Sequence, residues 1–238
     1  MRIGLATYEF RNKNIDFNIG QIKRGLREAS GKADILCFGE AFLQGFDSLC
    51  WDFETDKHIA VTQSSEIMNS VCRLSLKYGV DLIFGYIERE DESIYSSCAV
   101  ITNGQLTHNY RRISHGWKVF WRTDDHYKEG NTVVEFNYKG YPIMIAICGD
   151  MWDCQERFKT DGLLIWPIFV NFKLEEWEQV EKEAYAKQAL LSAERTMMID
   201  SLSPETEPNG VGGTFYFCNG EIIQSAEYGV ESIMIIEI

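Results

Sequence analysis

The sequence contains few basic residues, few prolines and few histidines. Of its 238 residues, 36 are Asp or Glu and only 23 are Lys or Arg, which gives a net charge of −13 at pH 7. This deficit of positive charge argues against a broad nucleic-acid-binding surface and against a surface for anionic membranes, since both require Lys/Arg clusters. With only four prolines and no linker-like or repetitive stretch, the sequence predicts one domain spanning residues 1–238.

Long hydrophobic runs are also missing. No stretch approaches the roughly 20 apolar residues of a membrane span. The apolar run that begins at Met1 becomes polar by Tyr8, which is too short for a signal peptide. We therefore expect a cytoplasmic protein with no membrane partner.

The seven cysteines form no regular pattern. Their number is odd and their spacing irregular, which fits free thiols in a reducing compartment better than a disulfide scaffold. Cys148 and Cys154 lack the spacing of a structural zinc site and have no accompanying histidine pair. Because no phosphate-binding glycine loop occurs either, we expect neither a metal nor a cofactor.

What the sequence does contain is an alternation of apolar strands and amphipathic helices. Ile15, Ile19, Ile22 and Leu26 share one face of a helix over 15–29. Further helices are predicted over 63–79 and 174–195, the latter with Leu174, Trp177, Val180 and Ala184 facing inward. Strands are predicted over 2–8, 34–38, 81–87, 95–102, 105–112, 132–137, 141–147, 163–166, 196–200, 213–218 and 231–237. Asn103-Gly104 and Asn219-Gly220 are typical hairpin turns. The pattern indicates an α/β fold of layered sheets covered by helices.

Two of the predicted strands run directly into residues that carry chemistry. Strand 34–38 leads into Gly39-Glu40, and strand 141–147 leads into Cys148-Gly149. Ligands of α/β sheets gather at such carboxyl ends. Cys148 could there act as a nucleophile, with the backbone N–H of Gly149 directed at a developing oxyanion, or it could simply pack as a small apolar residue.

A thiol nucleophile needs a base or a cation beside it. The chain has four histidines, of which His126, in a polar stretch, is a candidate. Glu40 could serve instead if burial raised its pKa, or it could be an ordinary turn carboxylate. The residues alone leave both alternatives open.

Four short motifs occur together in one order: Phe38-Gly39-Glu40, Tyr110-Arg111-Arg112-Ile113, Ile147-Cys148-Gly149-Asp150 and Gly212-Gly213-Thr214. In this order and spacing the chain resembles the nitrilase superfamily of carbon–nitrogen hydrolases over essentially its whole length. The resemblance implies a four-layer α-β-β-α sandwich with a Glu–Lys–Cys triad. It assigns Glu40 as the general base and Cys148 as the nucleophile that forms a thioester, with Gly149 contributing to the oxyanion hole.

The sequence departs from the family at the lysine, where it has Arg112. Arginine keeps the positive charge but is longer, planar and forked. Three possibilities are open: Arg112 does the work of the lysine, Lys118 reaches into the site, or hydrolysis is lost and the protein is a module that binds a small molecule or a protein.

Two further positions follow from the same resemblance. The family often has a second glutamate, for which Asp124 or Asp125 could stand in, unless both belong to an acidic solvated loop. Trp152, four residues after Cys148, is expected at the pocket entrance as a substrate-binding residue, unless it is an aromatic residue that fills the core. The expected partners are a small linear amide, carbamoyl compound or nitrile and, because family members associate through one face of the sandwich, a second copy in a homodimer or larger homo-oligomer.

Overall fold

The computed structural model describes residues 1–238 and contains two six-stranded sheets packed face to face. The first sheet has the order β14-β1-β2-β3-β4-β5 and the second the order β13-β12-β9-β8-β7-β6. The strands of the first sheet are β1 (Arg2–Thr7), β2 (Ile35–Cys37), β3 (Asp81–Glu90), β4 (Ser93–Thr102), β5 (Gln105–Arg111) and β14 (Ser232–Glu237). Those of the second are β6 (Val134–Tyr138), β7 (Tyr141–Ile145), β8 (Leu163–Pro167), β9 (Arg195–Ile199), β12 (Phe215–Cys218) and β13 (Glu221–Ser225). A small pair, β10 (Leu202–Ser203) and β11 (Gly210–Val211), lies apart from both sheets.

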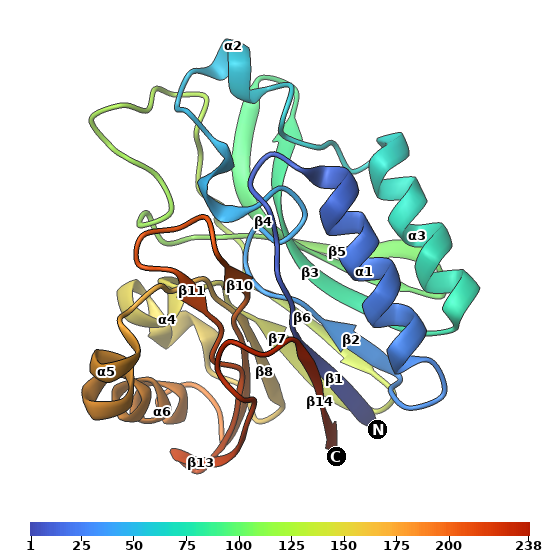
Figure 1. The fold of residues 1–238 in the computed structure, drawn as a ribbon, viewed down its shortest axis with the longest axis vertical. Helices are drawn as coiled ribbons and strands as arrows, with labels where there is room; N and C mark the ends of the chain where they lie inside the picture. The colour runs from blue at the N-terminus through green and yellow to red at the C-terminus, as the bar shows by residue number, and fades with distance from the viewer.

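Helices cover the outer face of each sheet (Figure 1). Helices α1 (Ile15–Ala29) and α3 (Glu66–Tyr78) lie on the first sheet. On the second sheet lie α5 (Leu174–Glu176), the π-helical turn η3 (Trp177–Glu181) and α6 (Lys182–Leu190). Short helical segments in the loops are η1 (Phe46–Ser48), α2 (Phe53–Asp56), α4 (Asp150–Asp153) and η2 (Gln155–Phe158). The α/β fold class and the four-layer α-β-β-α arrangement are therefore confirmed.

The alternation of side chains along the strands explains the layering. In β2, Ile35 and Cys37 point into the core between the two sheets, whereas Leu36 packs under the helices. In β3, Ile83 likewise points into the core between the two sheets, and Leu82 packs under the helices. Because both faces of these strands are buried, they are continuously apolar, as expected for parallel strands covered on both sides.

Most predicted elements are present within a few residues of their predicted bounds, and the clearest differences are the following. The helix predicted over 174–195 is divided by the π turn η3 and ends at Leu190. The extra residue of a π turn rotates the inward face, so Trp177 is buried but the predicted core residues Leu174 and Val180 are exposed. Strand β13, which follows the predicted Asn219-Gly220 turn, was not expected because it is largely exposed and polar. Strand β6 begins two residues later than predicted.

The two ends of the chain lie side by side on the first sheet (Figure 1). Strand β14 pairs antiparallel with β1 in a register that opposes Arg2 to Glu237. None of the helices is long and apolar enough to cross a membrane.

Candidate active site

Glu40 occupies a tight turn directly after β2. Its backbone N–H donates to the carbonyl of Ile168, 3.2 Å away, in the second sheet, and the next residue, Ala41, has a left-handed φ of 49°. A Cβ at Gly85 of β3 would collide with the backbone of this turn, so a glycine is required there. The turn places Glu40 where the two sheets meet.

The Cys148 turn follows β7 and is fixed from both sides. The Cys148 N–H donates to the carbonyl of Pro167 at 3.0 Å, and its own carbonyl accepts from the indole Nε1 of Trp166 at 2.9 Å. These bonds hold Cys148 at a φ of 43°, a left-handed conformation that is strained for a residue other than glycine. The Gly149 N–H, which follows the sulfur, has no hydrogen-bond partner in the protein and is available to an oxyanion.

Arg112 joins these two turns. Its side chain is 3% exposed, with Nη1 donating to Glu40 Oε1 at 2.8 Å and Nε donating to Ser114 Oγ at 2.7 Å. A side chain at position 149 would collide with Arg112 Nη2, so the guanidinium lies directly against Gly149. Burial alone would lower the pKa of Arg112, but the carboxylates of Glu40 and Asp150 raise it, and the cation is retained.

Only one oxygen of Glu40 is engaged. Oε1 accepts from Arg112 and from Ser96 Oγ, the latter at 3.2 Å, while Oε2 is buried without a partner. A buried acceptor with no partner is unfavourable unless a ligand or water completes it. Oε2 is therefore the oxygen available to take a proton.

The environment of Cys148 keeps its thiol neutral at rest. Burial raises the pKa of Cys148 to about 12, Glu40 raises it further, and Arg112 opposes both. The sulfur donates to the Phe169 carbonyl at 4.0 Å, and a side-chain hydrogen bond to Glu40 also raises its pKa. A neutral thiol reacts only when a base removes its proton during attack.

Asp150 is a positioning residue to which the sequence analysis gave no role. Its carboxylate accepts hydrogen bonds from the backbone N–H groups of Ile113, Ser114 and Ile147 and from the Tyr110 hydroxyl. These bonds connect the end of β5, which carries Arg112, to the Cys148 turn. The sequence did contain a signal for this role, because Asp150 belongs to the Cys148-Gly149-Asp150 motif.

Asp200 is a second residue that the sequence analysis missed. It follows β9, is fully buried, and abuts the Glu40 turn, since a Cβ at Gly39 would collide with Ser201 Oγ and approach the Ile199 carbonyl. Oδ1 accepts from Ser201 N–H at 2.8 Å, and Oδ2 has no partner. Burial, with a contribution from Glu40, raises the pKa of Asp200 well above its usual value. Like Glu40 and Cys148, it stands immediately after an apolar strand, which was the available signal.

The other predicted residues lie in different surroundings. Lys118 Nζ pairs with Glu129 at 2.7 Å and donates to the Tyr127 carbonyl, so it is not in the Glu40–Arg112 cluster. Asp124 and Asp125 are exposed, and Asp124 pairs with His126. The His126 ring stacks on Phe53 with 3.9 Å between ring centroids.

Trp152 lies beyond the Cys148 turn. It is 43% exposed and packs edge-on against Tyr185, with 5.0 Å between ring centroids. Tyr185 is electrostatically coupled to both Cys148 and Asp200, and its pKa is raised mainly by burial. This contact places Trp152 on the accessible side of the cysteine turn.

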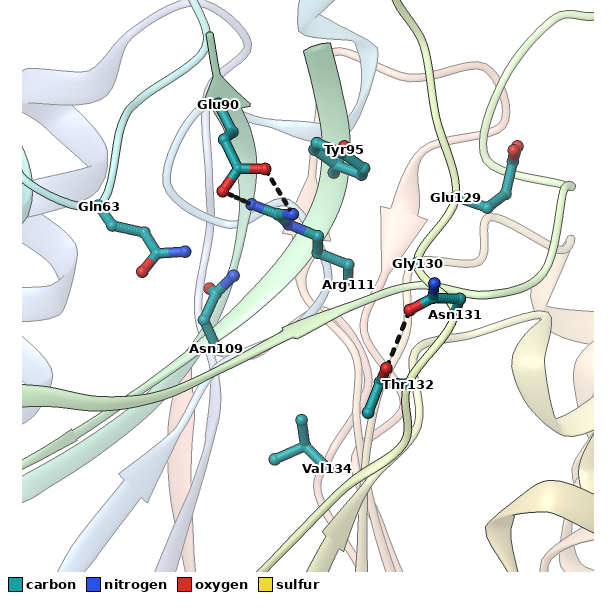
Figure 2. A pocket seen from close by; sticks show the side chains of 10 residues that line it. All are labelled: Gln63, Glu90, Tyr95, Asn109, Arg111, Glu129, Gly130, Asn131, Thr132 and Val134. Carbon is teal, nitrogen blue, oxygen red and sulfur yellow. Dashed lines mark hydrogen bonds and ion pairs between the residues drawn. The ribbon is translucent and has the colours of Figure 1, made fainter.

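Two cavities lie near this region. The smaller, about 10 Å³, adjoins Glu40 and is lined also by Ala41, Phe46, Leu49, Trp51, Ile87, Ser96 and Trp117. The larger, about 410 Å³, is polar and includes Arg111, Asn109 and Glu90 but none of Glu40, Arg112 and Cys148 (Figure 2).

Comparison with known proteins identifies the family. The profile of carbon-nitrogen hydrolases matches residues 2–156. The chain belongs to this family. It is thus a member of the nitrilase superfamily, as the four motifs predicted.

Relatives of this carbon–nitrogen hydrolase are distant. It is 22% identical to a glutamine-dependent NAD(+) synthetase of Thermotoga maritima, over 64% of this chain and 26% of the relative. It is 23% identical to a nitrilase of Meyerozyma guilliermondii, over 59% of this chain and 47% of the relative. The matched regions therefore span less than half the length of these curated relatives.

Solved structures show the same fold. The amidase from Nesterenkonia sp. superposes with a TM-score of 0.78 at 14% identity, covering 100% of this chain and 90% of that one. The glutamine-dependent NAD+ synthetase of Acinetobacter baumannii gives a TM-score of 0.77 at 18% identity, covering 98% of this chain and 44% of the other.

Proposed function

We propose that this member of the family hydrolyses a small linear amide through a thioester at Cys148. The observation that carries the proposal is the contact set of Arg112, which binds one oxygen of Glu40 and lies against Gly149. A base, a cation and a free backbone donor thus surround one thiol.

The first half-reaction forms the acyl-enzyme. Glu40 Oε2 takes the Cys148 proton as the sulfur attacks the carbonyl carbon, and the carbonyl π electrons move to oxygen. The Gly149 N–H and the Arg112 guanidinium stabilise this oxyanion. As the intermediate collapses, the carbon–nitrogen bond breaks, and the nitrogen leaves as ammonia or an amine with the proton from Glu40.

The second half-reaction releases the acid. Glu40 takes a proton from water, the resulting hydroxide attacks the thioester, and the carbon–sulfur bond breaks. The proton returns to the sulfur, which restores the neutral thiol favoured by burial. A carbamoyl compound would follow the same steps. A nitrile requires an added water before the thioester forms, and we place amides first.

Mass spectrometry of Cys148 after incubation with amides and nitriles tests the proposal. We expect an acyl adduct on the Cys148 peptide and none on the peptide of Cys154, a free, partly buried thiol whose pKa is raised to about 11. Glutamine belongs in the panel because two relatives are named for its use. Cys148→Ala removes adduct and turnover.

The competing function is that of a non-catalytic binding module. It is favoured by the small volume beside Glu40 and by the arginine at the position of the lysine. Iodoacetamide separates the two functions, because a nucleophile served by Glu40 reacts faster than Cys154 and loses that advantage in Glu40→Gln. Equal alkylation of the two cysteines in the wild type would favour the binding module.

We further propose that the chain assembles as a homodimer or larger homo-oligomer. The outer face of the second sheet carries exposed apolar residues on its helices, including Val180, Leu190 and Leu191. Sedimentation velocity of the wild type and of Val180→Glu measures assembly. A wild type that sediments as a monomer would contradict it.

A further inference from the structure

The cavity beside Glu40 contains one buried hydrogen-bond donor that the mechanism leaves unused. Trp117 is 8% exposed, and its indole Nε1 is buried without a partner. Trp117 and Glu40 line the same cavity, and each carries a buried polar atom without a partner, a donor on Trp117 and the acceptor Oε2 on Glu40. Most buried side-chain polar atoms of native proteins have a hydrogen-bond partner, so two unpaired ones on residues that line one cavity indicate a ligand.

The walls of this cavity are apolar and uncharged apart from Glu40. Phe46, Leu49, Trp51 and Ile87 form most of them, and Ser96 is already engaged with Glu40. The charge of Glu40 is paired with Arg112. A substrate group carrying its own charge would lose hydration here and gain no counter-ion.

The cavity is also small. Its volume of about 10 Å³ accommodates about one water-sized group, so it excludes a long acyl chain. Trp51 and Trp117, whose ring centroids are 6.2 Å apart, both line it. Both rings pack against Tyr127, with 5.6 Å between ring centroids for Trp51 and 6.5 Å for Trp117, and Trp51 is only partly buried.

We propose that Trp117 determines specificity by donating its indole N–H to an acceptor on the acyl chain of a short, uncharged carboxamide. A 2-hydroxy amide is the smallest substrate of this kind. The proposal rests on the amide hydrolysis proposed above, because the scissile amide must lie beside Glu40 for a group on its acyl chain to reach this cavity. It adds that the enzyme distinguishes acyl groups of equal size by whether they carry a hydrogen-bond acceptor.

Glycolamide and propionamide form a matched pair, since a hydroxyl in the first replaces a methyl in the second. We expect the wild type to favour glycolamide in kcat/KM by about tenfold beyond the ratio for hydroxide-catalysed hydrolysis, the value of one neutral hydrogen bond. Trp117→Phe, which keeps a ring but removes the donor, should abolish this excess. Trp51→Phe is the control, because it loses the same ring area and should keep the excess. The kcat/KM for glutamine should be lower than that for glycolamide by on the order of a hundredfold, because the charged groups of glutamine would lose their hydration in this cavity.

Binding to Cys148→Ala separates this proposal from the proposed function. If the wild type hydrolyses no amide but Cys148→Ala binds glycolamide more tightly than propionamide, and Trp117→Phe in that background removes the difference, the amidase function fails and the role of Trp117 stands. Turnover with the same glycolamide preference in wild type and Trp117→Phe would overturn the role of Trp117 alone. Preference for glutamine would overturn the uncharged substrate class. Absence of both turnover and binding would overturn both proposals.

Discussion

Two neighbouring arginines at the end of β5 form buried ion pairs of different character. Arg111 pairs with Glu88, and Arg112 pairs with Glu40 on the other side of the strand. Both glutamates are 1% exposed, but every oxygen of Glu88 is used, with bonds from Arg111, Ser97, Gln63 and Asn109. Arg111 also contacts Glu90, as Figure 2 shows. Glu40 leaves one oxygen free.

The two pairs differ in how many of the carboxylate oxygens have a hydrogen-bond partner. Burial alone would raise the pKa of Glu88, but Arg111 and the surrounding donors lower it, and the carboxylate stays ionised with no vacant acceptor. Such a pair can fix structure but has no position for a proton or substrate. The Glu40 pair has a cation on one side and an open position on the other, which is the arrangement that proton transfer requires.

Removing the charge from each glutamate should give the largest contrast. We expect Glu40→Gln to lower kcat/KM by about a thousandfold, within the range of general acid–base catalysis, and also to lower stability, because it leaves the buried Arg112 cation without its carboxylate. Glu88→Gln should lower the free energy of unfolding by about 3 kcal/mol, because Arg111 loses its buried carboxylate and keeps only the exposed Glu90, but it should spare kcat. Amide kinetics and urea unfolding of both variants measure this. The same loss of kcat in both variants would remove the distinction.

Changing the arginines should give the next largest effect. Arg112→Ala should lower kcat about a hundredfold, because it removes one oxyanion donor, whereas Arg112→Lys should recover most of the rate since it keeps the charge near Gly149. Lys118→Ala is the matched control and should leave kcat unchanged. Loss of turnover in Lys118→Ala alone would assign the cation to Lys118.

Asp200 allows a smaller test that concerns stability. Because burial raises its pKa, the folded state holds this proton more tightly than the unfolded chain does. Stability should therefore fall as pH rises from the unfolded pKa, near 3.9, through the raised folded pKa. Asp200→Asn cannot ionise, so it should melt above the wild type at pH 8 and by a smaller margin at pH 5. Equal margins at the two pH values would contradict a neutral Asp200.

The sequence was sufficient to predict the layers and the ends of strands from which the site is built. Apolar runs that stop at Glu40 and at Cys148 predicted both turns, because parallel strands buried on two faces leave their polar residues at the carboxyl end. The pairing of Arg112 with Glu40 rather than solvent could not be derived, since it depends on how β5 lies across the first sheet. Only the family resemblance, which rests on the ordered motifs, placed Arg112 and Glu40 in one site.

Other features depended on three-dimensional contacts that spacing does not reveal. The π turn at Trp177–Glu181 has no recognisable sequence signal, and it moved the buried face of the following helix. Glu129, which pairs with Lys118, stood in the acidic segment where Asp124 and Asp125 were considered. Only the folded loop distinguishes the one carboxylate that turns inward from its exposed neighbours.

The base and the cation belong to one sheet and the nucleophile to the other. Glu40 and Arg112 follow β2 and β5, whereas Cys148 follows β7, and the two groups meet across the core between the sheets. A change in that core that shifts one sheet along the other by a fraction of an ångström alters the gap between carboxylate and sulfur. The packing of core residues such as Ile145 and Ile83 therefore affects the rate of catalysis, although these residues do not take part in the reaction. Hydrostatic pressure compresses this core and so should change the rate without any mutation.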